Sequence, residues 1–367
     1  MEGLRVHAAA LKLRLGVTLS VRCLVATFLT TVKPLDYKCR DPVSGGSSRT
    51  GGPLHLPISR REFLSRASSA AVALGGAAAI PRAGVVLSAA ALPTSEPMAN
   101  RIVDVHVHFD EKNPGFIDDF LKVSERLNLT ACVLTPYANR RVVADAAQRH
   151  PAQIVPFGFV DLDAHDAVHQ VKEFHELGFR GLGELEFVKR PYTDSAYMPV
   201  YELANQYFWV VLFHTGIVLR RKFDLAEDVA SYRMRAFHLE EIARRFPKIT
   251  VIGAHCGNPE YEWAAEVARW NPNVFFDLSG STLVKMHDRL AEFQKIFWWS
   301  GTDEGTQTPD DDPSAFAKLV FGSDTGLDQI EGVVRQYRDL FEACSVPEHT
   351  QKLVMGGTLA KILHLVS

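Results

Sequence analysis

Cysteine is scarce in the 367-residue sequence: five cysteines are spread along the chain, and none belongs to a C-x-x-C pair. A disulfide framework or a thiolate zinc site needs cysteines at short, paired spacings, so neither is indicated. A long apolar run is also lacking, because the stretch from Leu15 to Thr31 is interrupted by Arg22 and is short for a membrane span. We therefore expect a globular protein, a class that the 47% hydrophobic content also favours, without a membrane span in its mature domain.

Clustered basic residues are lacking from most of the chain. The net charge is -3, but residues 1–97 hold 12 Lys and Arg against 5 Asp and Glu, which leaves 28 basic and 38 acidic residues, a net charge of -10, in 98–367. Nucleic acids and anionic membranes bind proteins through clustered lysine and arginine. The acidic composition of 98–367 therefore favours a small-molecule substrate and argues against nucleic acid as a partner.

The first hundred residues contain a targeting pattern. Arg60 and Arg61 are followed by Phe63 and Leu64, by an Ala- and Gly-rich stretch over 67–80 and by small residues at 88–91. This pattern resembles a twin-arginine export signal, which implies that the twin-arginine export machinery carries the folded protein to the periplasm or outside the cell. We expect residues 1–58 to be a poorly ordered extension, in keeping with a start codon assigned too early, 59–97 to be the signal segment and 98–367 to be the folded domain.

After Met98, short apolar segments alternate with amphipathic helical patterns, which is typical of parallel βαβ units. The alternation predicts eight strands, at 102–109, 131–137, 154–161, 179–187, 209–216, 250–257, 274–280 and 319–325. Eight such units in about 270 residues match a TIM (β/α)8 barrel. A doubly wound open sheet is the alternative, but no glycine-rich phosphate loop follows the first strand, so the single-domain α/β barrel is preferred.

Titratable side chains stand at the ends of four of the predicted strands. They are His106 and His108 at the first strand, His214 at the fifth, His255 at the sixth and Asp324 at the eighth. Active sites of TIM barrels lie at the carboxyl ends of the strands, so these side chains should meet. Because residues two apart share a strand face, we expect both histidines of the first strand to point into the barrel mouth, with Val103, Val105 and Val107 facing the helices.

The segments LFHTG, IGAHCGNP and FGSDT surround the last three of these residues. Together with the H-x-H pattern that precedes them, this ordered set resembles the amidohydrolase superfamily, in its amidohydrolase-related branch. The resemblance covers residues 100–367. It implies a metal-dependent hydrolase whose metal site is formed by the strand ends.

The chemistry of the side chains agrees with the roles that the resemblance implies. His106, His108 and His214 offer nitrogen ligands suited to zinc, and Asp324 offers a hard oxygen ligand; manganese or iron would also fit. A cation held in this way lowers the pKa of water and polarises a substrate carbonyl. Asp324 is the expected general base, and His255 either binds a second ion or hydrogen-bonds the polarised oxygen. The sequence leaves open whether the site holds one ion or two.

The fourth strand departs from the family pattern. Many relatives have a carboxylated lysine there that bridges two metal ions, whereas this strand contains Glu184 and Glu186 and no lysine before Lys189. Glu184 either bridges two ions or pairs with a nearby arginine, and the second case favours a single ion.

Residues that contact the substrate are less well defined by the sequence. Arg220 and Arg221 follow the fifth strand on a loop expected to overhang the site, where a guanidinium would clamp a substrate carboxylate. A solvated run of charge is the alternative. Tyr137, after the second strand, would form a wall of the substrate pocket unless it packs in the core.

Three functions are compatible with these residues. The first is hydrolysis of a C–O or C–N bond in a small lactone, ester or amide that carries a carboxylate. The second is non-oxidative decarboxylation of an aromatic or unsaturated acid, because the same branch includes metal-dependent decarboxylases. The third is a non-catalytic binding protein, against which the nearly complete set of metal ligands argues. A homo-oligomer is compatible with each of them.

Overall fold

The computed structural model of the protein describes residues 101–221, 223, 225–309 and 311–365. The predicted extension over 1–58 and the predicted signal over 59–97 lie outside the described residues, as does Lys222 in the loop after the fifth strand. Among the described residues, no helix combines the length and the apolar character that crossing a bilayer would need.

Seven parallel strands form one sheet in which each strand pairs with its neighbours in sequence. They are β1 (Ile102–His108), β2 (Leu129–Thr135), β3 (Ile154–Gly158), β4 (Gly181–Leu185), β5 (Val210–Phe213), β6 (Thr250–Gly253) and β7 (Val274–Phe276). β2 is buried along its whole length, as expected for a strand whose two faces are both covered.

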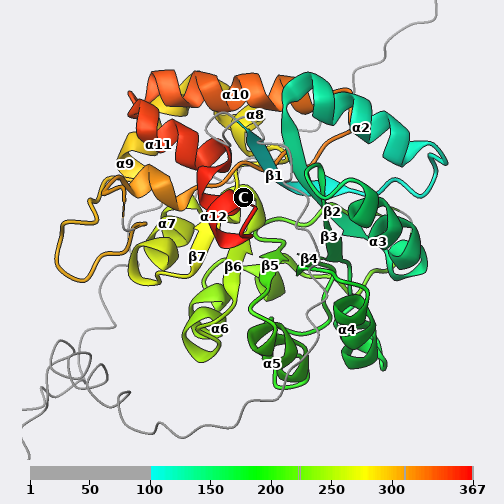
Figure 1. The fold of residues 1–367 in the computed structure, drawn as a ribbon. Helices are drawn as coiled ribbons and strands as arrows, with labels where there is room; N and C mark the ends of the chain where they lie inside the picture. Colours follow the sequence, from blue (N-terminus) through cyan, green and yellow to red (C-terminus); the bar gives the residue numbers. More distant parts are fainter. Residues whose placement is uncertain (1–100, 222, 224, 310, 366–367) are drawn as a thin grey trace, which may run out of the picture. The chain divides into compact units, whose positions relative to one another are not determined.

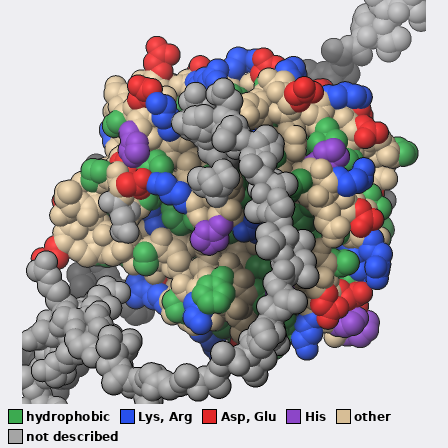
Figure 2. Space-filling view, viewed as in Figure 1, with side chains coloured by type: hydrophobic (Ala, Val, Ile, Leu, Met, Phe, Trp, Pro, Cys, Tyr) green, Lys and Arg blue, Asp and Glu red, His purple; other side chains and the backbone are tan. Residues whose placement is uncertain are grey.

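Helices follow the strands, and most of them lie outside the curved sheet (Figure 1). They are α2 (Phe116–Leu127), α3 (Arg140–Arg149), α4 (Ala167–Glu176), α5 (Met198–Gln206), α6 (His238–Arg245), α7 (Tyr261–Trp270), α8 (Thr282–Met286), α9 (Phe293–Ile296), α10 (Ile330–Ala343), α11 (Glu348–Lys352) and α12 (Thr358–Ile362). Seen from the same side, acidic and basic side chains are intermixed over the surface of this part of the chain (Figure 2).

Helix α2 illustrates why these segments are helical. Phe116, Phe120 and Ser124 recur every four residues, so they share one face, and that face is buried. The helix ends at Asn128, which adopts the left-handed conformation that often terminates helices.

The predicted strand over 319–325 is wrong as a regular strand, although the segment completes the ring. Leu319 forms an isolated parallel bridge with Phe276 of β7, and the backbone N–H of Val105 in β1 donates to the carbonyl of Phe321. This segment thus lies between β7 and β1, where an eighth strand would stand. The fold is a single-domain α/β TIM barrel, closed at this position by an extended segment rather than by a full ladder.

The expected alternation in β1 is also wrong in part. Val107 faces the helices, but Val103 and Val105 lie in the hydrophobic cluster inside the barrel. The register of β1 against β2 shifts between Asp104 and Val107, and such an irregularity changes which face later residues occupy. The inner cluster also includes Leu359 of α12, a helix that Figure 1 shows across the centre of the barrel.

Candidate metal centre

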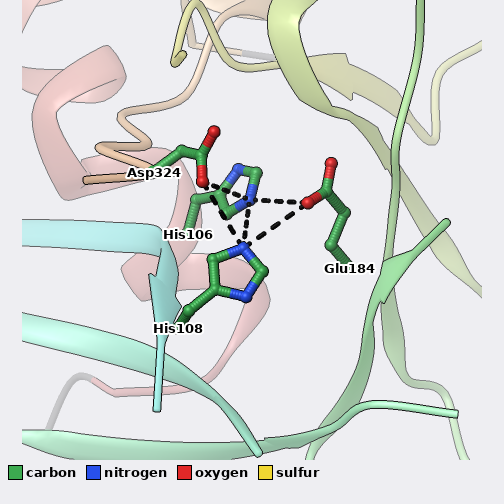
Figure 3. Close-up of side chains that lie close together, drawn as sticks. All are labelled: His106, His108, Glu184 and Asp324. Carbon is green, nitrogen blue, oxygen red and sulfur yellow. Dashed lines mark hydrogen bonds and ion pairs between the residues drawn. The ribbon is translucent and has the colours of Figure 1, made fainter. Parts of the chain in front are cut away.

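Four side chains from three separate parts of the barrel converge at its mouth (Figure 3). His106 and His108 come from the end of β1, and their Nε2 atoms lie 3.2 Å apart. Glu184 of β4 places Oε2 at 3.2 Å and 3.5 Å from these two nitrogens. Asp324 places Oδ1 at 3.6 Å and 3.4 Å from the same nitrogens. Four potential ligand atoms therefore surround one point.

A second group of ligand atoms adjoins the first and shares Glu184 with it. Oε1 of this carboxylate lies 2.8 Å from Nδ1 of His214 and 3.3 Å from Nε2 of His255. The two oxygens of one side chain thus face two different pairs of imidazoles. This is the arrangement that a carboxylate between two cations requires.

The donor set fits a divalent cation. Imidazole nitrogens and carboxylate oxygens are the ligands that zinc, manganese and iron take in proteins. Nδ1 is the nitrogen of His214 that faces Glu184; the second nitrogen, Nε2, is buried without a hydrogen-bond partner, which is costly. The side chains of His106 and Glu184 are 0% and 4% exposed, so the ligands of the deeper part of the site are shielded from water.

The carboxylates and the imidazoles of the site shift the pKa values of one another. Burial lowers the pKa of His108, but hydrogen bonds with Asp324 and Glu184 more than offset this and raise it to about 9. Burial by itself would raise the pKa of Glu184. The charge of His106 and the hydrogen bonds that histidines form with the Glu184 carboxylate instead hold that pKa well below its usual range. An ionised Glu184 and an ionised Asp324 attract cations into this pocket.

Two of these residues stand in an unusual backbone conformation. His255 and Asp324 have φ values of 64° and 45°, in the left-handed region that costs a non-glycine residue about 1–3 kcal/mol. Hydrogen bonds hold both: the backbone N–H of Asp324 donates to the carbonyl of His106, and that of His255 donates to Oδ1 of Asp277. Gly280 leaves the necessary room, because a Cβ there would lie 2.9 Å from Nδ1 of His255.

Sequence reasoning missed Asp277 and Ser279, which follow β7. Asp277 accepts a hydrogen bond from Nδ1 of His106, and the Ser279 hydroxyl lies 2.9 Å from Nδ1 of His255. Both side chains are buried. The signal was present, since Asp277 and Ser279 lie in the carboxyl-terminal half of the predicted strand over 274–280, and polar residues towards the carboxyl end of a barrel strand meet the rule that singled out Asp324.

The three residues predicted to contact the substrate each have a partner outside the cluster of potential metal ligands. Tyr137 donates its hydroxyl hydrogen to Glu173 of α4 and lies under the guanidinium of Arg140, so it packs against the outer layer. Arg220 donates to the carbonyl of Leu225 within its own loop. The guanidinium carbon of Arg221 lies 3.6 Å from the ring centroid of Phe187. In each case a nearby partner determines the side-chain direction, which the position of a residue in the sequence does not specify.

A cavity of about 900 Å³ opens beside the cluster. His108 and Asp324 line it, and Phe109, Phe116 and Leu327 supply apolar walls. Its volume is that of a small-molecule site, and its contact with two potential metal ligands makes it the natural place for a substrate.

A family model described as Amidohydrolase matches residues 131–325 of the chain. This range includes Glu184, His214, His255 and Asp324. No curated protein matches the chain.

Solved structures give the same fold. A TIM-barrel protein from Bordetella bronchiseptica is 13% identical with a TM-score of 0.53, and the alignment covers 72% of this chain and 98% of that one. The 5-carboxyvanillate decarboxylase from Sphingomonas paucimobilis is 12% identical with a TM-score of 0.50, covering 73% and 100%. At such low identities the likeness concerns the fold alone.

Proposed function

The chain belongs to the amidohydrolase family, and on this premise we propose that it is a metal-dependent hydrolase acting on a C–O or C–N bond of a small lactone, ester or amide. The observation that carries the proposal is the position of Glu184, whose two carboxylate oxygens each face a separate pair of imidazoles. This supports two cation positions that share one bridging carboxylate.

We propose that His106, His108 and Asp324 hold one cation, that His214 and His255 hold the other, and that Glu184 contacts both. The mixed nitrogen and oxygen set favours zinc, with manganese or iron as alternatives. When bound, such a cation lowers the pKa of water and polarises a carbonyl.

Asp324 is the proposed general base. Its side chain is 27% exposed and lines the cavity, so it can reach both the metal cluster and a substrate. Burial raises its pKa, but the charge of His106 and a hydrogen bond with His108 outweigh this and leave the pKa lowered. An ionised carboxylate at this place can accept a proton from water and later pass it to the leaving group.

The cavity also bears on the substrate. Its apolar walls suit an aromatic or aliphatic group next to the reacting bond. The basic side chains that line the cavity are paired with carboxylates, since Lys122 contacts Asp119 and Arg126 contacts Glu331. Arg220 contacts the carbonyl of Leu225 and Arg221 contacts the ring of Phe187, and the proposed substrates include carboxylated as well as uncharged ones.

Decarboxylation of an aromatic acid is the second candidate function. The likeness in fold to a 5-carboxyvanillate decarboxylase favours it, and the same cluster would bind the carboxylate of such a substrate. Release of carbon dioxide from aromatic acids, without turnover of lactones, esters or amides, would establish this reaction in place of hydrolysis.

We further propose that the protein is exported by the twin-arginine machinery and acts in the periplasm or outside the cell. The arginine pair at Arg60 and Arg61, with the apolar stretch and small residues that follow it, supports this proposal. Replacing both arginines with lysine should retain the protein in the cytoplasm, as fractionation would show.

The test of hydrolysis uses the full chain loaded with zinc or manganese and a panel of lactones, aryl esters and anilides. We expect Asp324→Asn to lower kcat/KM by about 100- to 10,000-fold, because the general base is lost. His108→Ala should abolish turnover because a metal ligand is lost.

The matched control is His165→Ala, since the His165 side chain is 98% exposed and lies outside the cluster. It should retain wild-type turnover. Equal activity in all three variants would contradict the assigned roles.

A further inference from the structure

Asp277 and Ser279 connect the two halves of the metal cluster. They are 0% and 1% exposed and lie just after β7. His106 belongs to one group of ligand atoms and His255 to the other. Asp277 contacts His106, and Ser279 contacts His255. The proposed function gives neither residue a role, although both side chains are buried and hydrogen-bonded within one network.

Every neighbour of the Asp277 carboxylate donates to it. Oδ2 lies 3.0 Å from Nδ1 of His106. Oδ1 accepts from the backbone N–H of His255 at 2.8 Å, from the backbone N–H of Ser279 at 2.9 Å and from the Ser279 hydroxyl at 2.6 Å. A carboxylate has only acceptors to offer, so we assign the hydrogen on His106 to Nδ1.

The Ser279 hydroxyl extends the same assignment to His255. Its single hydrogen is directed to Asp277, which leaves an oxygen lone pair facing Nδ1 of His255 at 2.9 Å. Nδ1 of His255 therefore carries the hydrogen as well. When a cation is bound, both imidazoles therefore offer Nε2 as the ligand atom beside Glu184, whose oxygens lie 3.2 Å from Nε2 of His106 and 3.3 Å from Nε2 of His255. Without a cation, Nε2 of the charged His106 donates to Glu184 instead.

We propose that Asp277 and Ser279 are positioning residues that fix the tautomers of His106 and His255 and so couple the two cation positions. One carboxylate acts directly on the first histidine and through a hydroxyl on the second. The inference rests on the proposed metal centre. It adds that the two positions depend on one shared group behind the ligands, as carboxylates that orient ligand histidines commonly do.

The Asp277 side chain packs closely against Gly322. A Cβ at Gly322 would lie 2.6 Å from Oδ2 of Asp277, so only glycine fits on that side. A substitution of Asp277 that keeps the shape of the side chain fits the same space and changes its hydrogen bonds.

Asp277→Asn separates the effect of Asp277 on His106 from its effect, through Ser279, on His255. An amide can accept with its oxygen only, and three donors on the Oδ1 side favour the oxygen there. The amide NH2 then faces Nδ1 of His106, which forces the hydrogen of that ring onto Nε2, the atom needed for the cation. The position formed with His108 should therefore weaken by about 10- to 100-fold, while the position of His255 is affected less.

Ser279→Ala should have the opposite pattern. It removes the acceptor for Nδ1 of His255 at 2.9 Å and a longer contact with Nδ1 of His106 at 3.3 Å, and it leaves the 3.0 Å bond between Asp277 and His106 in place. The cation position at His255 and His214 should weaken by about 10- to 100-fold, and the other should keep its affinity. Ser279→Thr, which retains a hydroxyl, should restore binding.

The measurement is stepwise binding of Zn²⁺ to the metal-free full chain, by competition with a chromogenic chelator and by metal content after dialysis. Asp312→Asn is the matched control: Asp312 is also buried and accepts from the Thr350 hydroxyl and the Ser314 backbone, away from the cluster. It should bind zinc as the wild type does. Thermal unfolding of each metal-free variant shows whether a loss of binding comes from loss of the fold.

The outcomes separate this inference from the proposed function. If the wild type binds zinc and both Asp277→Asn and Ser279→Ala bind it with the affinities of Asp312→Asn, the positioning role is wrong while the metal centre stands. A uniform loss of both positions in Ser279→Ala with an intact fold would also overturn the assignment. A wild type that binds no divalent cation would overturn the metal centre itself.

Discussion

Glu184 determines how charge is distributed in the cluster. A carboxylated lysine would present two oxygens on a long side chain, and Glu184 presents two oxygens from the strand end itself. Each oxygen faces its own pair of imidazoles, so each half of the site would receive part of one negative charge. Asp324 adds a second carboxylate, whose Oδ1 lies 3.6 Å and 3.4 Å from Nε2 of His106 and His108 and whose Oδ2 lies 3.9 Å from Nε2 of His255. The half of the site with His108 has the closer contacts with Asp324 and should bind a divalent cation more tightly.

Lys318 provides a residue-level prediction unrelated to metal. It is fully buried, and its ammonium donates to the carbonyls of Asn271 and Pro272. Burial lowers its pKa from 10.5 to about 7. Between these values the unfolded chain holds a proton that the folded protein has released, so this group makes the free energy of unfolding rise with pH. Below pH 7 the charged form is buried and the contribution is at its least favourable.

Lys318→Met should remove this dependence. Between pH 7.5 and 9.5, the free energy of unfolding of the variant should rise less steeply than that of the wild type, by about 1.4 kcal/mol per pH unit for one proton. Urea denaturation at several pH values measures this. Lys248→Met, at an exposed site, should leave the slope unchanged. Parallel profiles for the wild type and Lys318→Met would show that Lys318 stays protonated in the folded protein.

Much of the residue-level picture could be predicted because strand position determines it. The rule that barrel strands end at one rim predicted that His214, His255 and Asp324 would meet, and the structure brings them together with the histidines of β1. The two directions of the Glu184 oxygens could not be predicted, since they depend on side-chain torsions. Tyr137 could not be placed either, because Glu173, its partner, lies 36 positions away in sequence.

At the scale of elements, strand ends differ most from expectation. The predicted sixth strand ran to residue 257, but β6 stops at Gly253 and Ala254–Gly257 form a 3-10 turn that includes His255. His255 thus faces the site from a turn, whereas His106 does so from within β1. The shift within β1 has the same result, because it lets His106 and Val105 both face inward.

Helix α12 supports a prediction about the barrel interior. Leu359 is fully buried in the inner cluster with Val103 and Val105, so Leu359→Ala should leave a cavity there. We expect a loss of about 2–5 kcal/mol in the free energy of unfolding, measured by urea denaturation. Leu219→Ala, at a side chain that is 76% exposed, is the control and should change stability little. A loss of similar size in both variants would mean that α12 does not fill the barrel.

At the scale of the whole molecule, the fold was predictable because the alternation of strand and helix repeats along the chain. An error at one boundary, such as that of β6, leaves the other units unchanged. The closing segment at 319–325 was the exception, since a hydrophobic run does not show whether a strand will form a full ladder or a single bridge. The cluster then depends on closure, because Asp324 follows this segment and meets β1 only when the ring is complete.

The central claim is that side chains from five parts of the barrel hold divalent cations on both sides of Glu184. Diffraction from crystals of the zinc-loaded protein, with anomalous data at the zinc edge, tests it most directly. We predict two anomalous peaks, one among His106, His108 and Asp324 and one between His214 and His255, each in contact with one oxygen of Glu184. Peaks only at other residues, or none at these side chains in protein that retains zinc, would contradict the account.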